Sequence, residues 1–204
     1  MLVTPLVWRP AGPDAVLLEV DDTASALALA RGLRTSGAAR DVVSGARTVL
    51  LSGLLLSREE IGALAEAGAA STDWPSPAPL ERIEVVWDGA DLDWVAHRWG
   101  LTVQAAIARL ESVELVSAFC GFAPGFAYLS GLADGWAVPR LARPRTKVPA
   151  GSVAVADRWC GIYPRSSPGG WRLLGHTTAV LWDADRSTPA LLAPGTRVRL
   201  CGAS

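Results

Sequence analysis

The sequence contains few of the residues that bind metal ions or form covalent cross-links. Its 204 residues include three cysteines and two histidines, and no two cysteines form a Cys-x-x-Cys pair. A structural zinc site needs four closely spaced protein ligands, mostly cysteine and histidine. We therefore expect no metal site, and we expect Cys120, Cys160 and Cys201 to be reduced and mostly buried.

Long hydrophobic runs are also missing. No uncharged apolar stretch approaches the roughly 18 residues that a membrane-spanning helix requires. The first five residues do not form the basic and then apolar segment of a secretion signal. These absences predict a cytoplasmic protein that does not enter a membrane.

The common catalytic and nucleotide-binding loops are absent as well. There is no Gly-x-x-x-x-Gly-Lys-Ser/Thr loop, no Gly-x-Gly-x-x-Gly turn and no Gly-x-Ser-x-Gly elbow. The loop at 166–170 is similar to the serine-rich loop of amidases, but Pro168 removes a backbone donor and Lys147, the only lysine, lies in a different loop. The usual nucleotide cradles are therefore excluded, and the catalytic residues stay unknown.

Positive charge gathers in one stretch of the chain. Between residues 135 and 182 there are seven basic residues and one acid, a local net charge of +6 in a chain whose total is −1. A whole-chain pI near 6.1 argues against nucleic-acid binding. A local positive field suits a carboxylate or phosphate ligand, or an acidic partner surface. A solvated basic face is the alternative.

Three prolines between residues 75 and 79 predict a stiff linker. It divides the chain into an α+β domain at 1–79 and a second domain at 80–204. In the first domain, Ser57 and Glu60 form a capping box that opens a helix. Strands are predicted at 6–8, 16–20, 42–43 and 48–51, with a further helix that buries Ala26, Leu29, Ala30 and Leu33. This domain suits packing or docking rather than chemistry.

The second domain is predicted to be mostly β. Two short helices follow its first strand, with Asp91 as the N-cap of one and Thr102 as the N-cap of the other. Evenly spaced strands separated by Gly and Pro turns favour a closed or nearly closed barrel. The predicted strands lie at 83–87, 113–119, 153–156, 171–174, 179–182 and 198–200.

Clusters of glycine and proline between residues 119 and 178 also carry aromatic and basic residues, which ordinary turns do not need. Shaped loops on a rigid sheet are where sites usually lie. Arg140 and Arg145 each follow a proline and have no acid nearby in the sequence, although a distant acid can fold against them. The candidate ligand-binding residues are Phe122, Pro124, Gly125, Phe126, Arg140, Arg145, Lys147, Gly151, Ser152, Tyr163, Ser167, Gly169, Gly170, Trp171 and His176.

Short motifs recur in a fixed order along this stretch: Gly121-Phe122-Ala123-Pro124-Gly125-Phe126, Pro139-Arg140, Pro144-Arg145, Val148-Pro149-Ala150-Gly151-Ser152, Gly161-Ile162-Tyr163-Pro164, Ser167-Pro168-Gly169-Gly170-Trp171 and Gly175-His176-Thr177. Their order resembles one family, the allophanate hydrolase subunit 1 group, which includes the B subunit of 5-oxoprolinase and the sporulation-kinase inhibitor KipI. It is also similar to half of the carboxyltransferase domain of urea carboxylase. Trp87-Asp88-Gly89 and the segment 191–198 extend the resemblance over the second domain.

The resemblance implies a cyclophilin-like barrel after a smaller α+β domain. It implies a subunit that is inactive alone and acts with a homologous subunit 2 (the C subunit of 5-oxoprolinase), as a heterodimer or larger, and with a third, lactam-hydrolysing subunit. That complex opens 5-oxoproline, a small anion, to glutamate. The complex uses ATP, and this chain alone is expected to bind no cofactor. The alternatives are a regulatory protein that inhibits a histidine kinase, and part of a urea carboxylase-type carboxyltransferase.

Three positions depart from the family pattern. Leu110-Glu111 stand where the family usually has His followed by Ser or Thr. Trp159-Cys160 replace Gln-Thr, and His176 replaces the arginine of Gly-Arg-Thr. Since all three changes affect polar positions, this member is expected to keep the scaffold and the partner while binding a different small molecule.

Overall fold

The computed structural model describes residues 6–70 and 80–203, with residues 67–70 described as backbone only. The chain divides into two compact units, 1–77 and 78–204, which we describe separately. The predicted linker at 71–79 lies outside the described residues, so its stiffness and the boundary after residue 79 stay predictions. Within the described part of the chain, no helix is long and apolar enough to cross a membrane.

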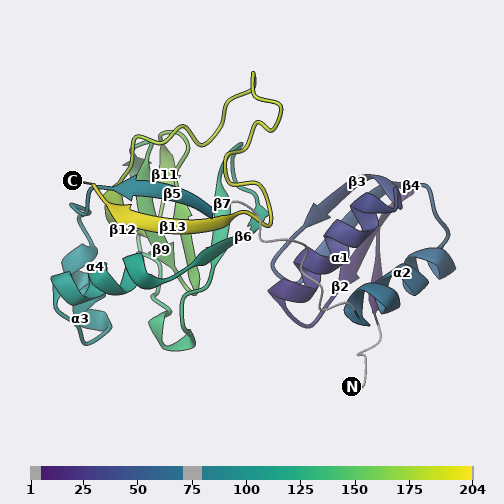
Figure 1. The fold of residues 1–204 in the computed structure, drawn as a ribbon, viewed down its shortest axis with the longest axis horizontal. Helices are drawn as coiled ribbons and strands as arrows, with labels where there is room; N and C mark the ends of the chain where they lie inside the picture. Colours follow the sequence, from purple (N-terminus) through teal and green to yellow (C-terminus); the bar gives the residue numbers. More distant parts are fainter. Residues whose placement is uncertain (1–5, 71–79, 204) are drawn as a thin grey trace. The chain divides into compact units, whose positions relative to one another are not determined.

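The first unit is a four-stranded antiparallel sheet with two helices (Figure 1). Asp22 accepts a hydrogen bond from the Ser25 N–H at 2.7 Å and starts α1, and Ser57 and Glu60 form the predicted capping box of α2. The strand order is β1-β2-β4-β3. The elements are β1 Val7–Gly12, β2 Ala15–Glu19, α1 Thr23–Thr35, β3 Ala39–Ser44, β4 Thr48–Leu54 and α2 Arg58–Ala70.

The second unit is built around a seven-stranded mixed sheet with the order β12-β9-β10-β7-β6-β13-β5. A separate ribbon pairs β11 with β8, and α3 and α4 lie together beside the sheet (Figure 1). The elements are β5 Leu80–Val85, α3 Leu92–Arg98, α4 Val103–Ser112, β6 Leu115–Cys120, β7 Ala127–Ser130, a 3₁₀ turn Asp134–Trp136, β8 Arg145–Val148, β9 Ser152–Ala156, β10 Trp159–Ile162, β11 Ser167–Gly169, β12 Arg172–His176 and β13 Arg197–Gly202.

The two edge strands of this sheet meet, which nearly closes the barrel. Directly after β5, Val86 exchanges two backbone hydrogen bonds of 2.9 Å with His176 at the end of β12. The chain then stays against β12, because the Gly89 N–H donates to Leu174 O at 3.0 Å. A Cβ at Gly89 would lie 2.2 Å from the Leu174 carbonyl carbon, so only glycine fits this approach. The predicted nearly closed barrel after an α+β unit is confirmed.

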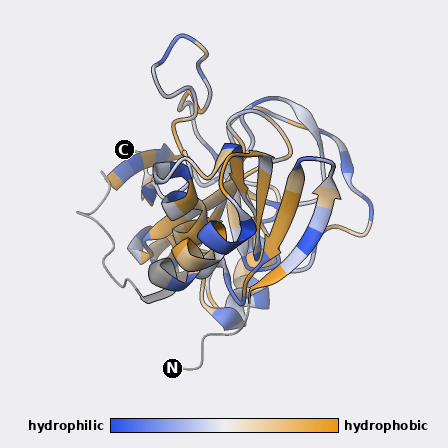
Figure 2. Ribbon diagram, turned by 90° about the vertical axis from the view of Figure 1, so that its right-hand side faces the viewer, coloured by the Kyte–Doolittle hydropathy of each residue, from blue (hydrophilic) through white to orange (hydrophobic). Residues whose placement is uncertain are grey.

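Strand β9 separates two hydrophobic clusters, because all five of its residues are buried. Val153 and Val155 point into the barrel core, which also contains Leu129, Leu174 and Leu200. Ala154 and Ala156 point the other way, under a cluster of aromatic side chains. Several strands carry long stretches of hydrophobic colouring (Figure 2). The small alanines leave room for large rings on the second face of β9.

Some predicted elements differ from the observed ones. The strand predicted at 179–182 is wrong, because only Trp182 forms a bridge, with Ala190. Strands β7, β8, β10 and β11 were not predicted, since each is short and two of them contain the glycines that suggested turns. The strand predicted at 83–87 begins earlier and ends at Val85. The Thr102 cap of α4 is confirmed, with the hydroxyl accepting from the Ala105 N–H at 3.2 Å.

Candidate functional site

Three buried aromatic rings gather on the second face of β9. Phe126 packs edge-on against Tyr163 and against Trp171, with ring centroids 5.3 and 5.4 Å apart. Two glycines make the space for them. A Cβ at Gly161 would lie 3.0 Å from the Phe126 and Trp171 rings, and a Cβ at Gly169 would lie 2.3 Å from the Tyr163 hydroxyl. The structure thus brings together residues from three of the sequence clusters.

Phe122 lies at the surface of this aromatic cluster. Its side chain is 61% exposed, yet it packs edge-on against Phe126 at 5.3 Å and Tyr163 at 6.2 Å. Its backbone has a φ of 67°, a conformation that a bulky residue rarely adopts. Hydrogen bonds from the Gly121 N–H to Phe126 O and from the Phe126 N–H to Ala123 O hold the loop. An exposed ring is therefore fixed in place by a strained backbone, which is typical of binding sites.

Gly151 joins the aromatic cluster to a neighbouring hollow. Its N–H donates to Tyr163 O at 2.7 Å, and its carbonyl accepts from the Thr177 N–H at 2.9 Å. Its φ is +80°, and a Cβ there would lie 2.1 Å from Thr177 O. A shallow hollow of about 330 Å³ follows, lined by Ala150, Gly151, Pro164 and residues 177–182.

Gly125 and Ser152 contribute to this region through the backbone and through burial. Gly125 has a φ of +82° and lies against Leu181 and Trp182, so the 121–126 loop borders the hollow. The Ser152 hydroxyl is buried and donates to Pro149 O at 2.9 Å. This hydrogen bond fixes the turn between Pro149 and Ser152.

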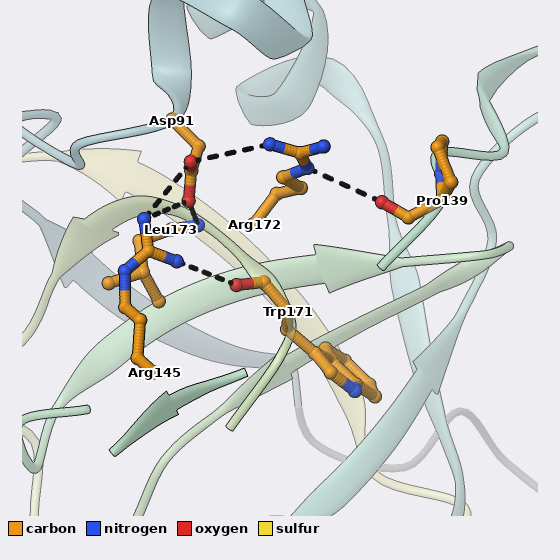
Figure 3. Close-up of polar contacts among 6 residues, drawn as sticks. All are labelled: Asp91, Pro139, Arg145, Trp171, Arg172 and Leu173. Atoms are coloured by element: carbon orange, nitrogen blue, oxygen red, sulfur yellow. Dashed lines mark hydrogen bonds and ion pairs between the residues drawn. The ribbon is translucent and has the colours of Figure 1, made fainter. Parts of the chain in front are cut away.

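Asp91 is a buried carboxylate between two arginines (Figure 3). Its side chain is 9% exposed, and it pairs with Arg145 at 2.9 Å and with Arg172 at 3.6 Å. It also accepts the Leu173 N–H at 2.7 Å. Asp91 occupies the predicted N-cap position of α3, but its side chain makes no capping hydrogen bond to that helix. A carboxylate that leaves water needs strong partners, and here they come from two distant segments of the barrel unit.

Arg145 therefore has the distant acidic partner that the sequence left open. Its guanidinium contacts Asp91 through one nitrogen and Trp171 O through another, at 3.4 Å (Figure 3). Its side chain is 28% exposed. Arg172 donates to Pro139 O at 3.3 Å and stacks on the Trp94 ring at 3.7 Å. Both arginines hold the fold together, so an anion-binding role for Arg145 has to compete with Asp91.

The other two predicted cations, Arg140 and Lys147, form no ion pair with a residue that the structure describes. Arg140 is exposed and lies 6.0 Å from the centroid of the Trp171 ring, and Lys147 is exposed on β8. Burial raises the pKa of Tyr163, and Arg140 acts on it in the opposite direction. The phenol therefore stays neutral near pH 7 and remains a hydrogen-bonding group.

His176 lies at the closure of the barrel rather than in the aromatic cluster. Its Nδ1 is 2.9 Å from Asp88 Oδ1, next to the backbone bridge with Val86. Sequence reasoning missed Asp88 as a partner, although it belongs to the Trp87-Asp88-Gly89 motif. That motif thus closes the barrel through the Gly89 backbone contact and the Asp88–His176 side-chain contact.

Other predicted residues have local roles. Pro124 is exposed in the Phe122 loop, and Gly170 lies beside Pro144. The Ser167 hydroxyl is buried, with no hydrogen-bond partner among the described residues. A further hollow of about 390 Å³, lined by Glu81 and residues of the 186–196 loop, contains none of the predicted site residues.

Two of the departures from the family pattern are packing positions. Leu110 is buried in the barrel core, while Glu111 accepts a hydrogen bond from Trp87 Nε1 at 2.9 Å. Cys160 is buried beside Leu129 in the sheet. Burial raises the pKa of its thiol to about 12. A thiol held neutral in this way is not a nucleophile at physiological pH.

We expect iodoacetamide at pH 8 to leave Cys160 unmodified in the folded protein and to modify it after denaturation. Because the pKa is raised from 9.0 to about 12, the unfolded thiol ionises first, so the thiol's contribution favours unfolding as the pH rises above 9. Mass spectrometry of peptides checks this, with the partly exposed Cys201 as the reactive control. Equal labelling of both cysteines in the folded protein would contradict the burial argument.

A nearly closed mixed barrel after a small α+β unit, with glycine- and proline-rich loops around one aromatic cluster, defines a carboxyltransferase-type fold. The urea amidolyase of Kluyveromyces lactis has this fold, with a TM-score of 0.76 over 98% of this chain and 15% of that chain. The identity is 17%, so this likeness shows the fold alone. The chain belongs to the family described as carboxyltransferase domain, subdomain C and D, whose profile matches residues 6–192.

Relatives within the family are more similar. The chain is 47% identical to the B subunit of 5-oxoprolinase from Escherichia coli O157:H7 over 120 residues, which are 57% of this chain and 55% of that protein. It is 43% identical to the same subunit from Haemophilus influenzae over 112 residues, 54% of this chain and 52% of that protein. The chain thus spans about half the length of the curated relatives it matches. The structure of TTHA0988 has a TM-score of 0.79 and 34% identity, covering 94% of this chain and 40% of that chain.

Proposed function

We propose that this chain is a subunit of a 5-oxoprolinase-type complex that opens 5-oxoproline to glutamate with ATP. The observation that carries the proposal is the 43–47% identity to two proteins named as the B subunit of 5-oxoprolinase. In this proposal the chain acts with a subunit 2 homologue and a lactam-hydrolysing subunit. It contributes binding surface and orientation rather than a complete reaction centre.

The chemistry of the described residues agrees with a subunit that is inactive alone. A hydrolytic centre needs a nucleophile, or an activated water, beside a general base. Among the described residues, His176 and Asp88 form an exposed pair where the barrel closes. Their hydrogen bond joins an imidazole to a carboxylate, so it does not itself activate a hydroxyl or thiol nucleophile. Ser152 donates to a backbone carbonyl, and Cys160 is neutral and buried. In this proposal the reaction draws on groups from the partners.

The test is reconstitution of the complex. The chain is co-expressed with its subunit 2 and lactam-hydrolysing homologues, and glutamate formation from 5-oxoproline is followed with and without ATP. We expect glutamate only when all three proteins and ATP are present, with the subunit 2 homologue co-eluting with this chain on size exclusion.

The controls separate the proposal from its rivals. The isolated chain is expected to turn over neither ATP nor 5-oxoproline. ATP hydrolysis by the isolated chain, lost on substitution of one of its own residues, would overturn the subunit role. A complex that assembles but forms no glutamate would instead favour the regulatory alternative.

A further inference from the structure

Four cations of the basic stretch have no acidic partner within the described residues. Arg145 and Arg172 hold Asp91, and Arg158 lies 3.9 Å from the exposed Asp134. The other four are exposed and form no ion pair with any residue that the structure describes: Arg140, Arg143, Lys147 and Arg165. A positive field that the fold leaves unneutralised attracts anionic groups from outside.

These four cations lie on or beside one ribbon of the barrel unit. Strands β8 and β11 pair through Ser167 with Val148 and through Gly169 with Arg145. The segment after Arg140 joins them, because the Leu141 N–H donates to Gly170 O at 2.7 Å. Arg143 and Lys147 come from the β8 side, and Arg165 comes directly before β11. We call these four exposed cations, on the ribbon and on the segments that adjoin it, the basic surface.

Phe122 adjoins this basic surface through Tyr163. The Phe122 ring packs on Tyr163 and on Phe126, and Arg165 follows two residues after Tyr163. Phe126 in turn packs on Trp171, whose ring centroid lies 6.0 Å from the Arg140 guanidinium. Phe122 is exposed, fixed by two buried rings and held at a positive φ. Fixed aromatic residues surrounded by arginines are the common energetic centres of protein interfaces.

The surface suits a protein rather than a small anion or a nucleic acid. The neighbouring hollow is lined by other residues, so its walls do not surround the four cations. A small anion held only by exposed cations would be weakly bound, because water screens each contact. The rest of the chain carries a net charge of −7, which disfavours nucleic acid.

We infer that Phe122 and the four cations form a docking surface for a partner protein. The matching surface of the partner has an apolar pocket that accepts Phe122, with aspartate and glutamate side chains around it. This inference rests on the proposed function, since a subunit that is inactive alone requires such a partner. It assigns the contact to the β8–β11 ribbon and the Phe122 loop.

The first test replaces Phe122 by glycine and measures binding to the immobilised subunit 2 homologue by surface plasmon resonance. Glycine accepts a φ of 67° without strain, and this gain offsets the lost ring packing and the greater freedom of the unfolded chain, so the thermal stability should change little. The affinity should fall by about tenfold or more, because the anchor side chain is lost. If Phe122 had only a structural role, the substitution would lower the thermal stability and leave the affinity unchanged.

The second test reverses two charges together, Arg140→Glu with Arg165→Glu. Association should slow by about tenfold or more at low salt, and the salt dependence of the association rate should weaken. Arg158→Glu is the matched control, since this exposed arginine lies outside the ribbon and faces Asp134. The control should bind like the wild type.

The outcomes separate this inference from the proposed function. If the wild-type chain binds no subunit 2 homologue, the proposed function and the docking surface are both wrong. If it binds and the Phe122 and charge-reversal variants bind equally well, only the docking surface is overturned. Normal assembly with lost glutamate formation in the charge-reversal variant would show a small-anion site and also overturn it. If the variants bind the subunit 2 homologue normally but lose self-association, as measured by light scattering, the surface would instead be a contact between copies of this chain. That result would also overturn the inference.

Discussion

Replacing Asp91 by alanine should lower the free energy of unfolding of the barrel unit by about 3–5 kcal/mol. The change removes the carboxylate that pairs with Arg145 and Arg172 and leaves the Leu173 N–H without its acceptor. Two cations then face each other with no acid between them. Seven of the nine tryptophans lie at or after residue 87, so urea unfolding followed by tryptophan emission reports mainly on this unit.

The matched control is Asp93→Ala, which changes an exposed acid of the same helix and should cost less than about 0.5 kcal/mol. Arg145→Lys should give an intermediate loss, because one ammonium cannot hold both Asp91 and Trp171 O. If Asp91→Ala and Asp93→Ala unfold at the same urea concentration, the three charged residues do not stabilise the fold. Arg145 would then be available to an external anion.

Local signals in the sequence predicted local structure well. The capping box of Ser57 and Glu60 and the cap at Thr102 join residues three apart, so the chain itself brings the partners together. The alternation of short strands with Gly and Pro turns was enough to predict the barrel. Both signals depend on neighbouring residues, which a sequence shows directly.

Partners far apart in the sequence were not predictable in the same way. Asp91 was interpreted as a helix cap, yet it bonds to Leu173, 82 residues away, and to Arg145, 54 residues away. Strand β10 was also not predicted, although its Gly161 lies beneath Phe126 and Trp171. Glycine occurs in turns and in strands, and only the contacts across the sheet distinguish the two.

The candidate site shows the same limit. Phe126, Tyr163 and Trp171 are three of the fifteen predicted ligand-binding residues, and their rings pack together. Their role in binding a ligand stays a prediction. The sequence did not separate cations held inside the fold from free ones, because Arg140 and Arg145 both follow a proline. Their difference comes from Asp91, whose distant segment reaches only Arg145. Charge counts along the chain therefore overestimate how much positive charge is available to a ligand.

Gly151→Ala should destabilise the barrel unit by about 3 kcal/mol, since two costs combine. A φ of +80° costs an alanine about 1–2 kcal/mol. The new Cβ would also lie 2.1 Å from Thr177 O, so a well-packed backbone must move, which typically costs a further 1–3 kcal/mol. Urea unfolding followed by tryptophan emission measures the loss.

Gly100→Ala is the control that isolates the first of these costs. Gly100 has a similar φ of +70°, but a Cβ there meets nothing within 4 Å, so only the backbone strain of about 1–2 kcal/mol should remain. The difference between the two variants then measures the contact between Gly151 and the 177–182 segment. If both variants lose equal stability, the 177–182 backbone moves away from the new Cβ at little cost, and the hollow that it lines can change shape. If Gly151→Ala loses more, Gly151 fixes the floor of the hollow, and its place in the family motif has a structural cause.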